Sequence, residues 1–157
     1  MQVSEIMHEN PVRTLTVRRI LVPIDWAELS NRAFKLAVTL ARQHHAELLV
    51  LNVVPLPTMM YGPPPETYLK NLREKLCRSK TCDPQIHIEH HLAEGDPAAA
   101  ILQLAREGKC DLIVMGTHGR EGLYRFVMGS VAEEVIRKAP CLVLTVNSDV
   151  PVSMIED

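Results

Sequence analysis

The sequence has little of what marks membrane-spanning, exported or nucleic-acid-binding proteins. No apolar run approaches the roughly 18–20 residues that a membrane-spanning helix requires, and residues 1–10 have neither the basic nor the apolar region of a signal peptide. Only 4% of residues are aromatic and the net charge is −2, so there is neither a stacking platform nor a basic surplus for nucleic acid. We expect a cytoplasmic protein with no membrane and no nucleic-acid partner.

Cysteines are also few, and none forms a Cys-x-x-Cys pair. The four are Cys77, Cys82, Cys110 and Cys141. Their scattered positions predict free thiols in a reducing compartment. Cys110 and Cys141 adjoin predicted strands, where a reduced thiol acts as a small apolar filler.

What the chain does have is a regular alternation of strand and helix patterns. Its 157 residues, 46% hydrophobic and 23% charged, fit one globular domain. Short, nearly continuous apolar runs are typical of parallel strands covered on both faces, whereas the run 86–92 alternates and suggests a half-exposed edge strand. The predicted strands are 20–24, 48–54, 86–92, 111–115 and 141–146, and the predicted helices are 29–44, 67–79, 97–108 and 130–138.

This order predicts an α/β fold, with a single open five-stranded parallel sheet and helices on both faces, similar to the Rossmann fold. We divide the chain into an N-terminal extension of uncertain order (1–17), an α/β domain (18–148) and a C-terminal tail (149–157). Ligands of such sheets bind beyond the carboxyl ends of the strands, where the strand order reverses.

The segment between the fourth strand and the last helix carries the chemistry. Gly116 and Gly119 follow the strand, and without a Cβ they can adopt positive φ and turn backbone N–H groups toward an anion. Gly129 and Ser130 open the helix, whose N-terminus attracts anions. Arg120 in the intervening loop can add positive charge, as can Arg125. The arrangement suits a di- or triphosphate.

A simpler interpretation of the same residues stays open. Ser130 and Glu133 form an S-x-x-E capping box, in which the serine only caps its helix. Gly116 and Gly119 then do no more than turn the chain.

The spacing Gly-x2-Gly-x9-Gly-Ser resembles the ATP-binding signature of the universal stress protein family. The resemblance runs from about Arg19 to Val146 and includes several separate motifs in the family's order. These are Ile20-Leu21-Val22-Pro23-Ile24-Asp25, Glu94-Gly95-Asp96-Pro97, Asp111-Leu112-Ile113-Val114-Met115-Gly116-Thr117-His118-Gly119-Arg120 and Gly129-Ser130-Val131-Ala132-Glu133. Some family members have lost the glycines and do not bind ATP, whereas this chain keeps them.

The resemblance implies a site for ATP, or ADP or AMP, with or without Mg²⁺. Asp25 would approach the ribose, or else cap the following helix. The other implied residues are Pro23, Ile24, Val53 and Met115 around the adenine, and Gly116, Gly119, Gly129, Ser130 and Val131 at the phosphates. For Ile24, Val53 and Met115, simple packing in the core is the alternative.

The resemblance also implies a homodimer in which the last strand pairs antiparallel with its copy. Leu142, Leu144 and Val146 alternate suitably for such an interface, and an unpaired strand edge favours self-association. Two departures from the family pattern lie outside the glycine signature: Ala27 stands where a hydroxyl residue is common, and Leu142 where proline is usual.

The function implied is an ATP-binding regulatory protein that acts in stress response as a dimer. The alternatives are a slow ATPase or another ATP-using enzyme, and a nucleotide-free dimerisation module. No catalytic residue is assigned, because the sequence lacks a Gly-x4-Gly-Lys-[Ser/Thr] loop and evident paired carboxylates for Mg²⁺.

Three histidines on the third predicted strand raise the question of a metal site. His87 and His91 would share one face with Glu89, while His90 would point the other way. No cysteine or carboxylate cluster with zinc spacing accompanies them in the sequence. The sequence therefore favours a solvated or half-buried strand face and no metal site.

Overall fold

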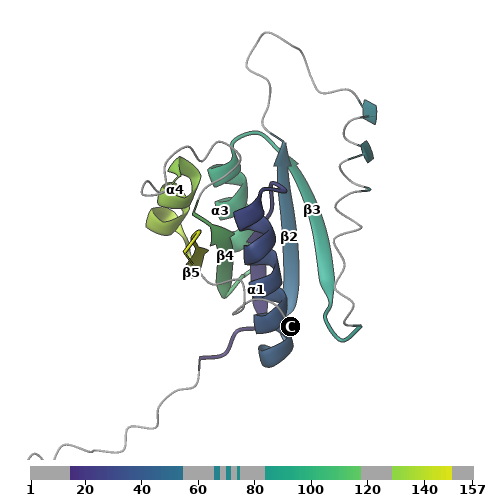
Figure 1. Ribbon diagram of the computed structural model, residues 1–157, viewed down its shortest axis with the longest axis vertical. Helices are drawn as coiled ribbons and strands as arrows, with labels where there is room; N and C mark the ends of the chain where they lie inside the picture. The colour runs from purple at the N-terminus through teal and green to yellow at the C-terminus, as the bar shows by residue number, and fades with distance from the viewer. Residues whose placement is uncertain are drawn as a thin grey trace, which may run out of the picture.

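The computed structural model describes residues 15–54, 84–117 and 129–149, together with helical positions 66, 67, 70, 71 and 74. Five strands form one sheet in the order β3-β2-β1-β4-β5 (Figure 1). Every neighbouring pair is parallel. The strands are β1 (Arg19–Pro23), β2 (Glu47–Val54), β3 (Ile88–Glu94), β4 (Leu112–Gly116) and β5 (Leu142–Val146). The predicted parallel α/β sheet is confirmed.

Helices cover both faces of this sheet, as predicted (Figure 1). On one face α1 (Glu28–His44) packs its alanines against a core that contains Ile20, Val22 and Val114. The other face carries α3 (Pro97–Glu107) and α4 (Ser130–Lys138), which pack on Leu21, Leu49 and Ile113. Because successive strand residues point to opposite faces, the continuous apolar runs fill both cores.

Both ends of α3 lie where the sequence predicts them. Asp96 is the N-cap, and its Oδ1 accepts a hydrogen bond from the N–H of Ala99 at 2.8 Å. Pro97 occupies the first helical position, where its missing N–H removes no helical bond. Gly108 is the C-cap and donates to the carbonyl of Leu104 at 2.8 Å.

The two edge strands differ from each other and from expectation. β3 is an edge strand with half-exposed residues, as predicted, but it runs from Ile88 to Glu94 instead of 86–92 because its register pairs Leu48 with Ile88. On β5, Leu142 and Leu144 are 52% and 38% exposed, whereas Val146 is only 1% exposed. The expectation that Val146 lies in a dimer interface is wrong, because the side chain already belongs to the core on the α1 face.

Cys110 and Cys141 are free thiols, and Cys110 is buried. Burial, with a smaller effect from Cys141, raises the pKa of Cys110 to about 11. Both thiols therefore stay protonated at neutral pH and pack as apolar groups, as predicted. Cys77 and Cys82 lie outside the described residues.

Val17 is 4% exposed and belongs to the core on the α1 face, although the sequence assigned it to the N-terminal extension. The rest of that extension up to residue 14, much of the predicted helix 67–79, and the tail after residue 149 lie outside the described residues. Within the part that is described, no helix is both long enough and apolar enough to span a bilayer.

Candidate functional site

The strand order reverses between β1 and β4. From β1 the chain moves outward to β2 and β3, and it then returns to the opposite side of β1 to form β4 and β5. In an open parallel sheet the crevice for a ligand lies at such a reversal, beyond the carboxyl ends of the two strands. Here those ends are Pro23 and Gly116, so the fold brings together two segments that the sequence singled out.

The chain after β1 is held by β2. The N–H of Ile24 donates to the carbonyl of Leu51 at 2.8 Å, and the Nδ2 of Asn52 donates to the carbonyl of Ile24 at 2.7 Å. Asn52 is 6% exposed, so this bond forms in a low-dielectric interior where an unpaired carbonyl is costly. The backbone at Ile24 is thereby fixed although Pro23 ends the regular strand.

Asn52 was not among the predicted site residues. The signal in the sequence was a single amide side chain within the otherwise apolar run 48–54. A polar residue at a buried strand position requires a partner, and here the partner is the backbone of the neighbouring strand's end.

Asp25 forms a tight turn that leads into α1. Its Oδ1 accepts from the N–H of Ala27 at 3.0 Å, and its own N–H donates to the Oγ of Ser30 at 3.3 Å. Trp26 between them has φ of 68°. The N-cap of α1 is Ala27, and no side chain makes a cap hydrogen bond there, so Asp25 closes the turn ahead of the helix and does not cap it.

The structure gives a different reason from the sequence for a glycine at position 116. Among the described glycines only Gly95 has positive φ, so the expectation of positive φ at Gly116 is wrong. A Cβ on Gly116 would lie 2.9 Å from the Cβ of Leu29 and 3.1 Å from its carbonyl carbon. Glycine is therefore required by the close approach of α1 to the end of β4.

The N-terminus of α4 faces the same end of the sheet. Gly129 is the N-cap, with φ −62° and ψ 148°, and its N–H donates to the carbonyl of Thr117 at 2.7 Å. Ser130 is the first helical residue, and no side chain caps this helix. The capping-box interpretation of Ser130 and Glu133 is therefore wrong, because a capping serine must precede the helix. Among the described residues no side chain caps the first N–H groups of α4, which can therefore bind an anion.

The predicted adenine-lining residues divide between the two faces of the sheet. Val53 and Met115 pack with the core under α3 and α4, and Pro23 shares that face because it lies two residues after Leu21. The Ile24 side chain packs instead with the core on the α1 face. Only its backbone is then available to a ligand at the strand-order reversal. Val131, also predicted, packs against the same core as Met115, whereas Gly119 and Arg120 lie outside the described residues.

This end of the sheet therefore offers backbone donors, a helix N-terminus and an apolar floor. Such a combination binds an anion attached to a flat apolar group. Among the described residues, the one group of His, Cys, Asp or Glu side chains spaced for a metal ion lies at the amino end of the sheet instead.

Comparisons with known proteins find chains of similar sequence. The universal stress protein family model matches residues 16–147. A universal stress protein of Methanocaldococcus jannaschii is 34% identical over 140 residues, which is 83% of this chain and 82% of that protein. A putative universal stress protein of Staphylococcus haemolyticus is 32% identical over 144 residues, covering 86% and 87% of the two chains.

Solved structures show the same fold. The universal stress protein from Lactobacillus plantarum has a TM-score of 0.70 at 27% identity and covers 85% of this chain and 100% of its own. A universal stress protein crystallised in complex with cAMP has a TM-score of 0.63 at 28% identity and covers 85% and 98%.

Proposed function

The chain belongs to the universal stress protein family, and we propose that it binds ATP, or ADP or AMP, as a regulatory protein in stress response. The observation that carries the proposal is the meeting of β1, β4 and the N-terminus of α4 at the strand-order reversal. A relative with this fold was crystallised with cAMP, which supports an adenine nucleotide as the ligand.

We assign the residues the roles that the family resemblance implies. Gly129, Ser130 and Val131 begin α4 and would hold the phosphates through backbone N–H groups, joined by the Ser130 hydroxyl. Pro23, Val53 and Met115 would contact the base from the face that α3 and α4 cover. Asp25 would contact the ribose through Oδ2, because its Oδ1 already accepts the hydrogen bond that closes the turn. Gly119, Arg120 and any Mg²⁺ complete the proposed phosphate site.

Equilibrium titration of the purified chain with ATP, ADP, AMP and cAMP tests this proposal. We expect at least one of them to bind below millimolar concentration. Failure of all four at millimolar concentration would overturn the proposal and favour a nucleotide-free module. Single-turnover incubation then separates a binding protein, from which ATP is recovered unchanged, from a slow ATPase.

A second part of the proposal concerns assembly. Leu142 and Leu144 are exposed on an edge strand whose outer backbone groups face away from β4. We propose that a second copy pairs there to form a homodimer, because an apolar, unpaired edge favours association. Light scattering of Leu144→Lys should give a monomer, while Leu15→Lys, which also changes an exposed leucine, should leave the mass of the wild type. Equal masses for wild type and Leu144→Lys would contradict the dimer.

A further inference from the structure

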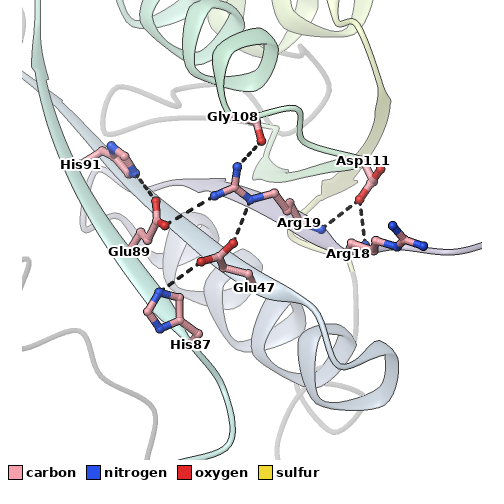
Figure 2. Close-up of polar contacts among 8 residues, drawn as sticks. All are labelled: Arg18, Arg19, Glu47, His87, Glu89, His91, Gly108 and Asp111. Carbon is pink, nitrogen blue, oxygen red and sulfur yellow. Dashed lines mark hydrogen bonds and ion pairs between the residues drawn. The ribbon is translucent and has the colours of Figure 1, made fainter.

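Charged and imidazole side chains gather at the amino end of the sheet, opposite the proposed nucleotide site (Figure 2). Arg19 begins β1 and Glu47 begins β2, while His87 directly precedes β3 and Glu89 is its second residue. The register pairs Arg19 with Glu47 and Leu48 with Ile88, which brings His87 beside Glu47. One ligand atom from each of Glu47, His87 and Glu89 lies within 4.8 Å of the others.

The two carboxylates divide their oxygens in the same way. Glu47 accepts from the Nε of Arg19 through Oε2 at 2.8 Å, and its Oε1 lies 3.1 Å from the Nε2 of His87. Glu89 places Oε1 at 3.5 Å from the Nη2 of Arg19 and Oε2 at 3.3 Å from the Nε2 of His91. Each carboxylate therefore has the guanidinium on one oxygen and an imidazole beside the other (Figure 2).

Arg19 is itself held in place from a third side. Its Nη1 donates to the carbonyl of Gly108 at 2.6 Å, where the C-terminus of α3 favours a positive charge. With neutral imidazoles, Arg19 and the two carboxylates sum to one negative charge. Burial raises the pKa of Glu89, but hydrogen bonds to His91 and Glu47 and the charge of Arg19 outweigh it and hold that pKa below its ordinary value.

Imidazole nitrogen and carboxylate oxygen together are ligands typical of Zn²⁺. With bonds of about 2.0–2.2 Å, neighbouring ligand atoms of a tetrahedral zinc ion lie about 3.3 Å apart. The two imidazole–carboxylate distances of 3.1 and 3.3 Å match that spacing. The rest of the cluster must contract, and His87, whose side chain is 71% exposed, has the freedom to move inward.

We propose that Glu47, His87 and Glu89 bind a zinc-class dication at the amino end of the sheet, with His91 as the neighbouring fourth ligand. Arg19 hydrogen-bonds the outer oxygens of both carboxylates, the supporting role that holds metal-ligating carboxylates in position. The ion would link β2 to the edge strand β3. This site is separate from the nucleotide site, because the eight residues of β2 span about 25 Å.

Titration calorimetry with Zn²⁺ alone, on the reduced full-length chain without nucleotide, tests the proposal. We expect one ion per chain, and a loss of affinity of at least about tenfold in both His87→Ala and Glu47→Gln. His87→Ala is the cleaner variant because its exposed side chain supports no core packing. His90→Ala is the matched control, since His90 lies on the opposite face of the same strand, and it should bind as the wild type does.

Two further measurements separate this site from general binding to thiols and histidines. Cys110 lies at the same end of the sheet and is therefore a competing Zn²⁺ ligand. If the proposed site is right, Cys110→Ser binds Zn²⁺ as tightly as the wild type. Mg²⁺ should give no binding, because it prefers six oxygen ligands. Zn²⁺ should raise the melting temperature of the wild type and of His90→Ala but not that of His87→Ala.

The proposal is overturned if the wild type binds no Zn²⁺ at about 100 μM, or if His87→Ala binds as the wild type does. It is equally overturned if Cys110→Ser or His90→Ala removes binding, since either result places the ion elsewhere. None of these outcomes depends on nucleotide binding, so the two proposals fail independently.

Discussion

The carboxyl and amino ends of the same five strands are built from different kinds of atoms. At the carboxyl ends the interactions come mainly from the backbone: Ile24, Thr117 and Gly129 are fixed by main-chain hydrogen bonds, and a helix begins there. At the amino ends the interactions come from side chains, with Arg19 between Glu47 and Glu89. Backbone groups suit an anion with an attached base, whereas carboxylates and imidazoles suit a cation.

The comparison predicts that a substitution can remove ligand binding at one end of the sheet without affecting the other end. The sharpest test at the carboxyl end is Gly129→Val. Its φ of −62° and ψ of 148° are open to any residue, so valine adds bulk at the helix N-terminus without backbone strain. We expect ATP affinity to fall by about 100-fold, equivalent to about 3 kcal/mol, and the melting temperature to fall slightly because valine is a poorer N-cap than glycine, while Zn²⁺ binding remains that of the wild type. Unchanged ATP affinity would place the phosphates elsewhere.

Gly116→Ala tests whether close packing, and not backbone conformation, explains the other glycine at this end. The new Cβ would meet Leu29 at 2.9 Å, so we expect about 2–3 kcal/mol of destabilisation in urea unfolding. The control is Gly95→Ala, where the added Cβ meets nothing within 4 Å but φ is +116°. We expect about 1 kcal/mol there. A Gly116→Ala chain as stable as the wild type would remove the packing explanation.

Asn52→Ala removes the buried side chain that links β2 to the end of β1. The carbonyl of Ile24 would lose its donor, and we expect about 2 kcal/mol of destabilisation together with weaker ATP binding. Asn31→Ala is the matched control, because its Nδ2 donates to the carbonyl of Trp26 at an exposed position and at 3.5 Å. If both variants lose equally little stability, Asn52 does not position the site.

The two ends also differ in how far the sequence predicts them. Gly116, Gly119 and Gly129 all precede α4 at fixed spacings along the chain, so the sequence located that segment and its helix start at Ser130. It mistook the reason for Gly116, because the contact with Leu29 joins residues far apart in the chain. It also left open a cap at Ser130, since the S-x-x-E pattern does not reveal which residue precedes the helix.

At the amino end the sequence showed only part of the cluster. His87, Glu89 and His91 were visible on one predicted strand, but Glu47, the partner of His87, lies forty residues before it. The pairing depends on the register of β2 with β3, and that register started β3 two residues later than the alternation suggested. A shift of β3 by one residue against β2 would have turned His87 and Glu89 to the other face of the sheet, away from Glu47. The order of helices and strands along the chain can be predicted from one sequence, whereas strand register requires the packed sheet.

The smallest expected effect belongs to Arg19→Met, measured with a chelator present. The substitution keeps the apolar stem but leaves Glu47 and Glu89 without their shared counter-ion and the carbonyl of Gly108 without its donor. Because Arg19 is 31% exposed, solvent screens part of the loss, and we expect about 1 kcal/mol in urea unfolding. Lys138→Met, which breaks an ion pair with Glu134, should cost less, since the side chains of Lys138 and Glu134 are 51% and 38% exposed. ATP affinity of Arg19→Met should stay within about twofold of the wild type. A larger change would mean that the ends are coupled through β1, the strand that Arg19 begins and that Pro23 ends.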